Sequence, residues 1–389
     1  MKRCPARAAS LPELGGLQWV CENTGQCQDV AEEVRALLQE FRLLEQVELS
    51  QPENSEHVLL RAHLNSAAWS AWTPGHDTLD LHRRLDHPSS DSPEFTGLRE
   101  ILVALLASPI GMGFASVAAL RSHLRVRLNI ARAAQKTALA FKTEAAERPE
   151  AYWRYDEEHG FLLRPGAPLI DALIAATQPE VTGKLYDFSC YRASEYVILL
   201  GLAQEMQTHH PDLLQQLQTQ CEQHAIRSGQ FHEVFLVEYG SMEDPLPLRF
   251  YVPGDRLWFR NPDEASADVT GYEGSWVIYM GQGLFSNFWK RDQPFTLEDK
   301  CLEIYFWRSG LYRDAQGEPQ MDEALVEAEV ARCQSDPVRK QAVLAQMLRM
   351  RDAKGVYALG GCIDTTREFP RGVWGRDCEL SLPQAAAAR

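Results

Sequence analysis

The sequence has little that would carry the chain into or across a membrane. Its basic opening, residues 1–18, is followed by no apolar stretch of signal-peptide length. The most apolar run, residues 102–114, is shorter than the roughly 20 residues that a membrane-spanning helix needs. We therefore expect a cytoplasmic protein with no membrane partner.

Positive charge is also scarce. The chain has 39 Lys and Arg residues against 54 Asp and Glu residues, which gives a formal net charge of -15. This balance argues against a nucleic-acid partner. The content of 45% hydrophobic and 24% charged residues is typical of a packed globular protein. At roughly 150 residues per domain, the 389 residues predict two or three folded units, or one elaborated domain with long terminal extensions.

Metal-ligand spacing is missing as well. Three histidines and three aspartates share one polar segment without lying on a definable element: His76, His82, His87, Asp77, Asp80 and Asp86. A structural metal site needs its ligands at fixed spacings on such elements. We expect no metal and no other cofactor.

The chain is organised as helices followed by strands. Apolar residues recur at helical spacing in residues 28–47, 95–108, 116–145 and 190–207, and the period changes to that of strands after residue 231. We predict an α+β fold in which a helix packs on an antiparallel sheet. The expected units are a largely helical and loop-rich N-terminal extension (1–110), a catalytic core (111–312), and a C-terminal helical extension and tail (313–389).

Cys190 has the most distinctive position of the nine cysteines. It follows small and acidic residues and precedes a strongly apolar helical pattern, so we place it at a helix N-terminus. The helix dipole and free N–H groups favour a thiolate there, which predicts a nucleophile that ionises near neutral pH. The alternative is that Cys190 is a small residue packed in the core.

A thiol nucleophile needs a base or ion-pair partner. The eleven histidines end at His232, which we expect to open the first strand and which is the best-placed histidine. Glu273 directly precedes a predicted strand and is the best-placed carboxylate. The alternative for Glu273 is an ordinary solvated residue of a turn.

The sequence resembles the bacterial protein-glutamine gamma-glutamyltransferases (transglutaminases) associated with sporulation and spore coats, which have a papain-like core. The residues that carry the resemblance lie at 128–133, 152–154, 160–163, 188–190, 197–198, 253–262 and 274–281. Their order along the chain is that of the family. The resemblance implies that Cys190 is the nucleophile.

The same resemblance shows departures around Cys190. Ser189 stands where the family has Glu, and Gly274-Ser275 stands where the family has Gly-Glu, so Glu273 fits only after a shift of about two positions. A histidine of the family falls on Asn287 or its neighbour Phe288. The resemblance therefore implies that the thiol is kept while its partners are rearranged. Ser189 and Asn287 are further candidates from the resemblance, and His232 is a candidate from its position in the sequence.

By resemblance, the expected reaction is protein cross-linking. Cys190 would form a thioester with a glutamine side chain of a protein substrate, and the amine of a lysine would resolve it into an isopeptide bond. Such a reaction needs a channel that excludes water, for which four aromatic residues are candidates, with sheet core as the alternative: Trp258, Trp276, Phe285 and Trp289. Two other functions stay open, a cysteine hydrolase (a glutamine deamidase or cell-wall-amidase-like enzyme) and a catalytically inactive scaffold.

Overall fold

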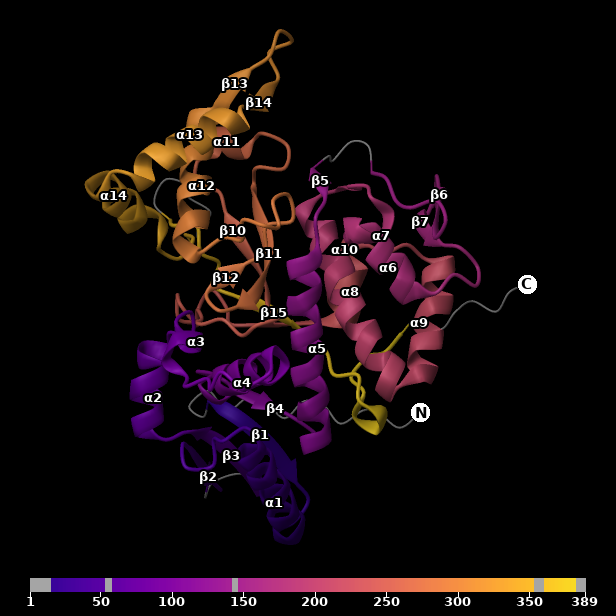
Figure 1. Ribbon diagram of the computed structural model, residues 1–389, viewed down its shortest axis with the longest axis vertical. Helices are drawn as coiled ribbons and strands as arrows, with labels where there is room; N and C mark the ends of the chain where they lie inside the picture. Colours follow the sequence, from indigo (N-terminus) through magenta and orange to yellow (C-terminus); the bar gives the residue numbers. More distant parts are fainter. Residues whose placement is uncertain (1–14, 53–57, 142–145, 353–359, 383–389) are drawn as a thin grey trace.

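The computed structural model describes residues 15–52, 58–141, 146–352 and 360–382 (Figure 1). The described residues combine helices with an antiparallel sheet, as predicted, but strands also occur before residue 231 and helices after it, so the two are less segregated along the sequence than expected. None of the described helices is long and apolar enough to cross a membrane. The tail after residue 382 lies outside the described residues.

The N-terminal region contains a four-stranded sheet in addition to the predicted helices and loops. Its strands are β1 (Gly16–Cys21), β2 (Val47–Ser50), β3 (Val58–Leu64) and β4 (Gly111–Gly113), in the order β2-β3-β1-β4. Helices α1 (Thr24–Glu40), α2 (Ser66–Trp72) and α4 (Pro93–Leu106) pack with it. The prediction of a largely helical and loop-rich extension did not include this sheet, because strands of three to seven residues contain too few alternating positions to stand out from the sequence.

The central sheet has five strands in the order β12-β11-β10-β15-β9. They are β9 (Leu236–Tyr239), β10 (Arg256–Arg260), β11 (Gly274–Gly281), β12 (Leu284–Phe285) and β15 (Arg367–Pro370). All neighbouring strands run antiparallel, which confirms the predicted antiparallel sheet. Because β15 comes from the C-terminal segment, that segment is part of the core sheet and is not only a helical extension.

The β11–β12 hairpin fixes one edge of this sheet. Its turn consists of Gln282 and Gly283, with φ angles of 57° and 74°. Two consecutive left-handed residues form the kind of turn whose twist matches a hairpin, and glycine adopts this conformation without strain.

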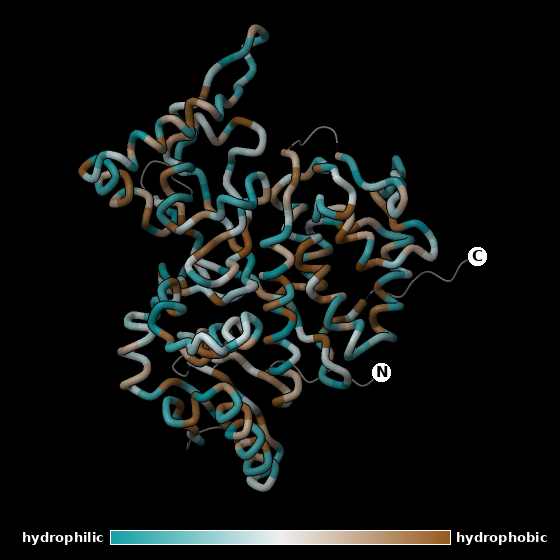
Figure 2. The backbone as a smooth tube through the Cα atoms, in the orientation of Figure 1, coloured by the Kyte–Doolittle hydropathy of each residue, from teal (hydrophilic) through white to brown (hydrophobic). Residues whose placement is uncertain are grey.

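Two long helices pack side by side next to this sheet, α5 (Val117–Lys136) and α8 (Cys190–His209). Helix α8 also contacts β11 and is buried over most of its length, in agreement with its apolar sequence. Outer helices are amphipathic instead, as the alternating teal and brown along α1 in Figure 2 shows. The expected helix packed on an antiparallel sheet is thus present, with its N-terminal residue directed to the sheet side.

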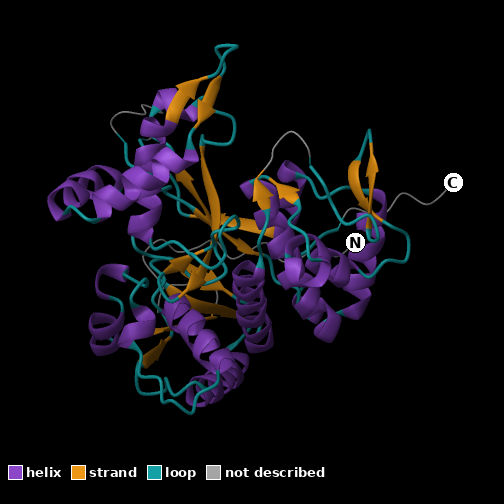
Figure 3. Cartoon of the chain, turned by 45° about the horizontal axis from the view of Figure 1, so that its top comes forward, coloured by secondary structure: helices purple, strands orange, loops and turns teal. Residues whose placement is uncertain are grey.

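The C-terminal helices form a separate layer next to β10 and β11 (Figures 1 and 3). They are α12 (Leu297–Gly310), α13 (Glu323–Gln334) and α14 (Pro337–Met347), and the projecting hairpin of β13 (Leu311–Arg313) and β14 (Pro319–Met321) connects the first two. The remaining elements are α3 (Leu81–Arg84), β5 (Ala140–Phe141), β6 (Trp153–Asp156), β7 (Gly160–Leu163), α6 (Leu169–Thr177), α7 (Pro179–Thr182), β8 (Asp187–Phe188), α9 (Pro211–Gln223), α10 (Ser228–Phe235), α11 (Glu264–Ala267) and two single 3-10 turns, η1 (Pro74–His76) and η2 (Gly375–Asp377).

Candidate active site

Cys190 is the first residue of α8, where the sequence predicted it. The preceding residue, Ser189, is the N-cap, and its hydroxyl oxygen accepts a hydrogen bond from the backbone N–H of Arg192 at 3.3 Å. The thiol is half-buried, in contrast to most of the described cysteines, which are buried. Ser189 therefore has a clear structural role in ending the preceding strand and starting the helix that carries the thiol.

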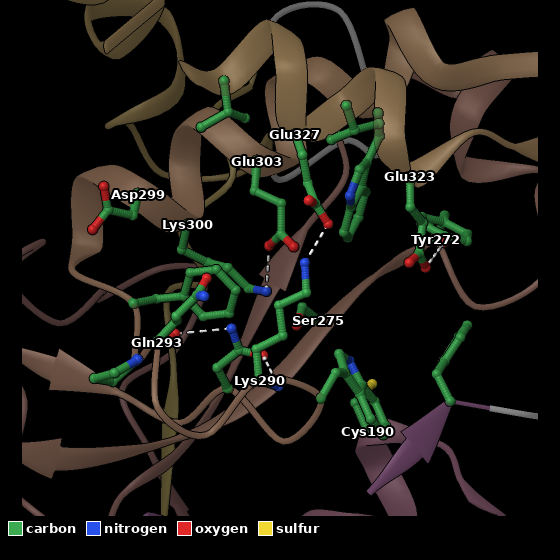
Figure 4. Close-up of a pocket in the computed structure, with 18 of the residues that line it drawn as sticks. Cys190, Tyr272, Ser275, Lys290, Gln293, Asp299, Lys300, Glu303, Glu323 and Glu327 are labelled. Atoms are coloured by element: carbon green, nitrogen blue, oxygen red, sulfur yellow. Dashed lines mark hydrogen bonds and ion pairs between the residues drawn. The ribbon is translucent and has the colours of Figure 1, made fainter. Parts of the chain in front are cut away.

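The Cys190 thiol faces a cavity of about 690 Å³ (Figure 4). One wall comes from the start of β11, with Tyr272 just before the strand and Ser275 on it, and another comes from the loop after β12, with Asn287 and Trp289. Helices α12 and α13 form the remaining wall. The cavity thus joins segments that are more than 100 residues apart in the sequence, and it gives a substrate access to the thiol.

The cavity is lined by charged side chains that are paired with one another. The ammonium of Lys300 donates to the carboxylate of Glu303 at 2.6 Å, and Lys290 forms an ion pair with Glu327. The Tyr272 hydroxyl donates to Glu323 at 2.7 Å. Among the described lining residues there is no histidine and no arginine. A charged, polar cavity of this kind can bind polar substrate groups, but it contains no imidazole to act as a base.

The pKa of the Cys190 thiol is raised above its ordinary value. Burial is the largest cause, and it outweighs the backbone N–H groups of Trp276 and Tyr191 that donate to the sulfur. The positive charge of Lys300 also lowers this pKa, whereas the negative charge of Glu273 raises it. Burial therefore acts against the predicted ionisation near neutral pH, because the helix N-terminus does not fully compensate for the lost hydration of the thiolate.

Glu273 lies between two residues that line the cavity, but it does not line the cavity itself. Its side chain is exposed, while its backbone carbonyl accepts a hydrogen bond from the N–H of Asn261 at 3.0 Å. The carboxylate acts on the Cys190 thiol through its charge. The geometry places Glu273 at the rim of the cavity.

Asn287 lines the cavity and is buried there. Its amide nitrogen donates to the backbone carbonyl of Gln293 at 2.9 Å, and its amide oxygen accepts from the N–H of Lys290 at 3.1 Å. These two bonds hold the loop after β12 in its conformation.

His232 does not open a strand, as the sequence analysis expected, but lies inside α10. The helix continues to Phe235 and the strand β9 begins only at Leu236, because the segment 228–235 is amphipathic at helical spacing. The His232 ring is 2.6 Å from a carboxylate oxygen of Glu368 and does not line the Cys190 cavity. The second carboxylate oxygen of Glu368 accepts from Arg256.

The four aromatic candidates for channel walls have different positions. Trp289 lines the cavity. Phe285 is fully buried in the core, so its expected place in a channel wall is wrong. Trp258 and Trp276 stack on each other with ring centroids 6.1 Å apart, outside the lining of the cavity. The sequence analysis missed Lys300, Glu303 and Glu323. The strand-like pattern expected after residue 231 included residues 300–308, which form helix α12 instead, and both helices lie outside the resemblance and carry no chemical motif.

The polar segment of residues 76–87 does not form a metal site. Within the described part of the chain, no group of three or more His, Cys, Asp or Glu side chains is arranged to hold a metal ion. Asp77 instead pairs with Arg249 at 2.7 Å, and His76 contacts the carbonyl of Ala107 at 2.9 Å.

A thiol at a helix N-terminus, in a cavity against an antiparallel sheet, defines a candidate cysteine-dependent enzyme. The model of the protein-glutamine gamma-glutamyltransferase family matches residues 83–358, more than half of the chain. The chain therefore belongs to this family, and the resemblance found in the sequence is confirmed. The family is that of transglutaminases, so the function of the chain is of transglutaminase type.

Other comparisons are more distant. The solved transglutaminase from Geobacillus stearothermophilus, without its C-terminal extension, is similar over 54% of this chain and 96% of its own, with 19% sequence identity and a TM-score of 0.38. The search of curated proteins found no match.

Proposed function

We propose that the protein is a cross-linking transglutaminase in which Cys190 attacks the side-chain carboxamide of a glutamine and transfers the acyl group to a lysine or another primary amine. The observation that carries this proposal is the position of Cys190 at the start of α8, facing the cavity, in a chain that belongs to the transglutaminase family. The partners are proteins that expose glutamine and lysine side chains. We further propose that α8 and the central sheet correspond to the papain-like core of the family.

The proposed reaction has two halves. The Cys190 sulfur forms a bond to the carboxamide carbon, the carbon–nitrogen bond breaks, and the nitrogen takes a proton and leaves as ammonia. The amine of the second substrate then attacks the thioester carbon, loses a proton and releases the Cys190 sulfur. Negative charge develops on the carbonyl oxygen in both halves. The backbone N–H groups that already converge on the sulfur, those of Tyr191 and Trp276, support a role of this region in binding that charge.

We propose Glu273 as the carboxylate that exchanges protons with the departing ammonia and the incoming amine. Its exposed side chain at the rim of the cavity and its electrostatic effect on the thiol support this role. Neither His232, which is paired with Glu368, nor Asn287, which holds a loop, is as well placed for proton transfer.

The test is incorporation of a labelled primary amine into a glutamine-rich protein, without added calcium. We expect the wild type to incorporate the amine and Cys190→Ala to fall to background. Cys378→Ala is the matched control, because Cys378 is the other half-buried cysteine of the described chain and does not line the cavity. Equal incorporation by wild type and Cys190→Ala would overturn the proposal.

Two further readouts refine the result. Glu273→Gln is expected to lower incorporation roughly 100-fold or more, the typical loss for a removed general acid or base. Ammonia release that depends on Cys190 without amine incorporation would instead show that water resolves the thioester, and the protein would then be a deamidase.

A further inference from the structure

We infer that Lys300 supplies the positive charge that holds the Cys190 thiolate in this cavity, and that Glu303 limits how much of this charge acts on the sulfur. The inference rests on the proposed function in one respect, that Cys190 is the nucleophile. Lys300 acts through Cys190, so it is a positioning residue for the thiolate and does not itself bond to the substrate.

Lys300 is an unusually buried lysine. It is the fourth residue of α12, its side chain is 5% exposed, and Figure 4 shows it extended into the cavity. Its ammonium lies 4.0 Å from the centroid of the Phe295 ring and donates to Glu303. Burying an ammonium is costly, and the charge acts over a longer distance in a low-dielectric site than in water. The fold therefore holds a buried positive charge on the wall that Cys190 faces, and the carboxylate of Glu303 offsets part of it.

Other charged groups around Cys190 are less able to play this part. Lys290 lines the same cavity, but its side chain is 46% exposed and paired with Glu327. Arg192, on α8, donates to Glu195 and to the carbonyl of Ile226.

The arginine on the neighbouring strand already has an ion-pair partner. Arg256, on β10, is paired with Glu368 and packs against the rings of Tyr191 and Trp276. The acidic and phenolic groups that line the cavity or act on Cys190 from other elements carry negative charge or none, so none of them stabilises a thiolate by its charge: Tyr272, Glu273, Asp299, Glu303, Glu323 and Glu327.

The charge of Lys300 acts on the thiol in the required direction, since it lowers the pKa of Cys190 against the larger effect of burial. In many cysteine enzymes a protonated histidine stabilises the thiolate. No histidine lines the described part of this cavity, and Lys300 takes over the electrostatic half of that role. An ammonium stabilises the thiolate without accepting its proton, so the thiol proton passes to solvent.

The test is the pH dependence of Cys190 alkylation by iodoacetamide, followed by mass spectrometry of the Cys190 peptide in the full-length protein. The alkylation rate rises with pH as the thiol ionises, and the pH at half of the maximal rate is the midpoint. Lys300→Met should move this midpoint to higher pH, and at a fixed pH below the midpoint it should slow alkylation roughly tenfold. Glu303→Gln should do the opposite, because it removes the carboxylate that offsets the lysine charge. Lys290→Met is the matched control and should change the rate less than about twofold, because its charge is screened by solvent.

The predicted shifts of the midpoint have opposite signs in the two variants, which distinguishes an electrostatic effect from a loosened structure. A variant that merely opened the cavity would speed alkylation in both Lys300→Met and Glu303→Gln. An unchanged midpoint in Lys300→Met, or shifts of the same sign in both variants, would overturn the inference. The measurement requires no transferase activity, so failure of amine incorporation with the predicted shifts would contradict only the proposed function.

Discussion

The cavity beside Cys190 and the ion-pair network around Asp255 both collect charged side chains, but the two regions bind them in different ways. Asp255 is fully buried, and its carboxylate accepts from Arg127 at 2.8 Å, from the Tyr239 hydroxyl at 2.5 Å and from the N–H of Val252 at 2.8 Å. In the cavity, Glu303 and Glu327 each pair with one lysine, and Glu323 accepts a hydrogen bond from one hydroxyl.

This difference separates charges that stabilise the fold from charges that are free to respond to a substrate. A buried carboxylate with three donors cannot change its partners without a large cost. A carboxylate or ammonium at a cavity wall can exchange partners with water or with a substrate group at a much smaller cost. We therefore expect substitutions around Asp255 to affect stability and substitutions around Lys300 to affect the reactivity of Cys190.

The largest expected effect is on stability, from Arg127→Met. This change leaves the charge of Asp255 buried without its cation, which typically costs about 3–5 kcal/mol in the free energy of unfolding. Urea denaturation measures this loss, and Lys300→Met should cost less in the same assay, because the carboxylate of Glu303 that it leaves unpaired is 29% exposed and can be hydrated. The double variant Arg127→Met/Asp255→Asn should recover part of the loss. A similar cost for Arg127→Met and Lys300→Met would remove the distinction between the two regions.

A second, smaller effect concerns the carboxylate of Glu100, which is buried and is not paired with a cation among the described residues. Glu100, on α4, is 5% exposed and accepts a hydrogen bond from the N–H of Gln282 at 2.8 Å. Burial raises the pKa of Glu100 to about 7. The folded state therefore keeps this proton at pH values where the unfolded state has lost it, and stability should fall as the pH rises from about 4.5 to about 7.

Denaturation at pH 5 and pH 8 tests this dependence. The wild type should lose up to about 3 kcal/mol more than Glu100→Gln between the two pH values, because the amide cannot ionise. Glu94→Gln is the control, since Glu94 is exposed on the same helix. Parallel pH profiles for wild type and Glu100→Gln would show that the Glu100 carboxylate is not responsible.

Features encoded by local patterns could be predicted from the sequence, whereas features that depend on distant residues could not. The position of Cys190 and the strands β9 to β12 follow from local patterns, an apolar helix after small residues and alternating strands between glycine-containing turns. The position of β15 between β10 and β9 depends on pairing between residues more than 100 positions apart, and no local pattern encodes it. No local pattern predicts the wall of the cavity either, because α12 and α13 come to lie opposite Cys190 only in the folded chain.

Chemical roles were harder to predict than positions. The sequence places Cys190 at a helix N-terminus, but the pKa of its thiol depends on burial by distant segments. His232 looked suitable as a lone histidine near a strand, yet its partner Glu368 comes from the C-terminal strand. Motifs therefore indicate which side chains can react, while tertiary packing decides which of them can act together.

The smallest predicted effect tests whether Ser189 only stabilises the fold or also takes part in the reaction of Cys190. Ser189 is the N-cap of α8, so Ser189→Ala should lower the free energy of unfolding by about 1 kcal/mol. Ser189→Asp should keep most of the stability, because Asp is an equally good N-cap, but its negative charge beside Cys190 should slow alkylation of the thiol. Amine incorporation by Ser189→Ala should stay within a few-fold of wild type under conditions where both are folded. A much larger loss of incorporation in Ser189→Ala would assign the hydroxyl a part in the chemistry, and the departure from the glutamate of the family would then be functional.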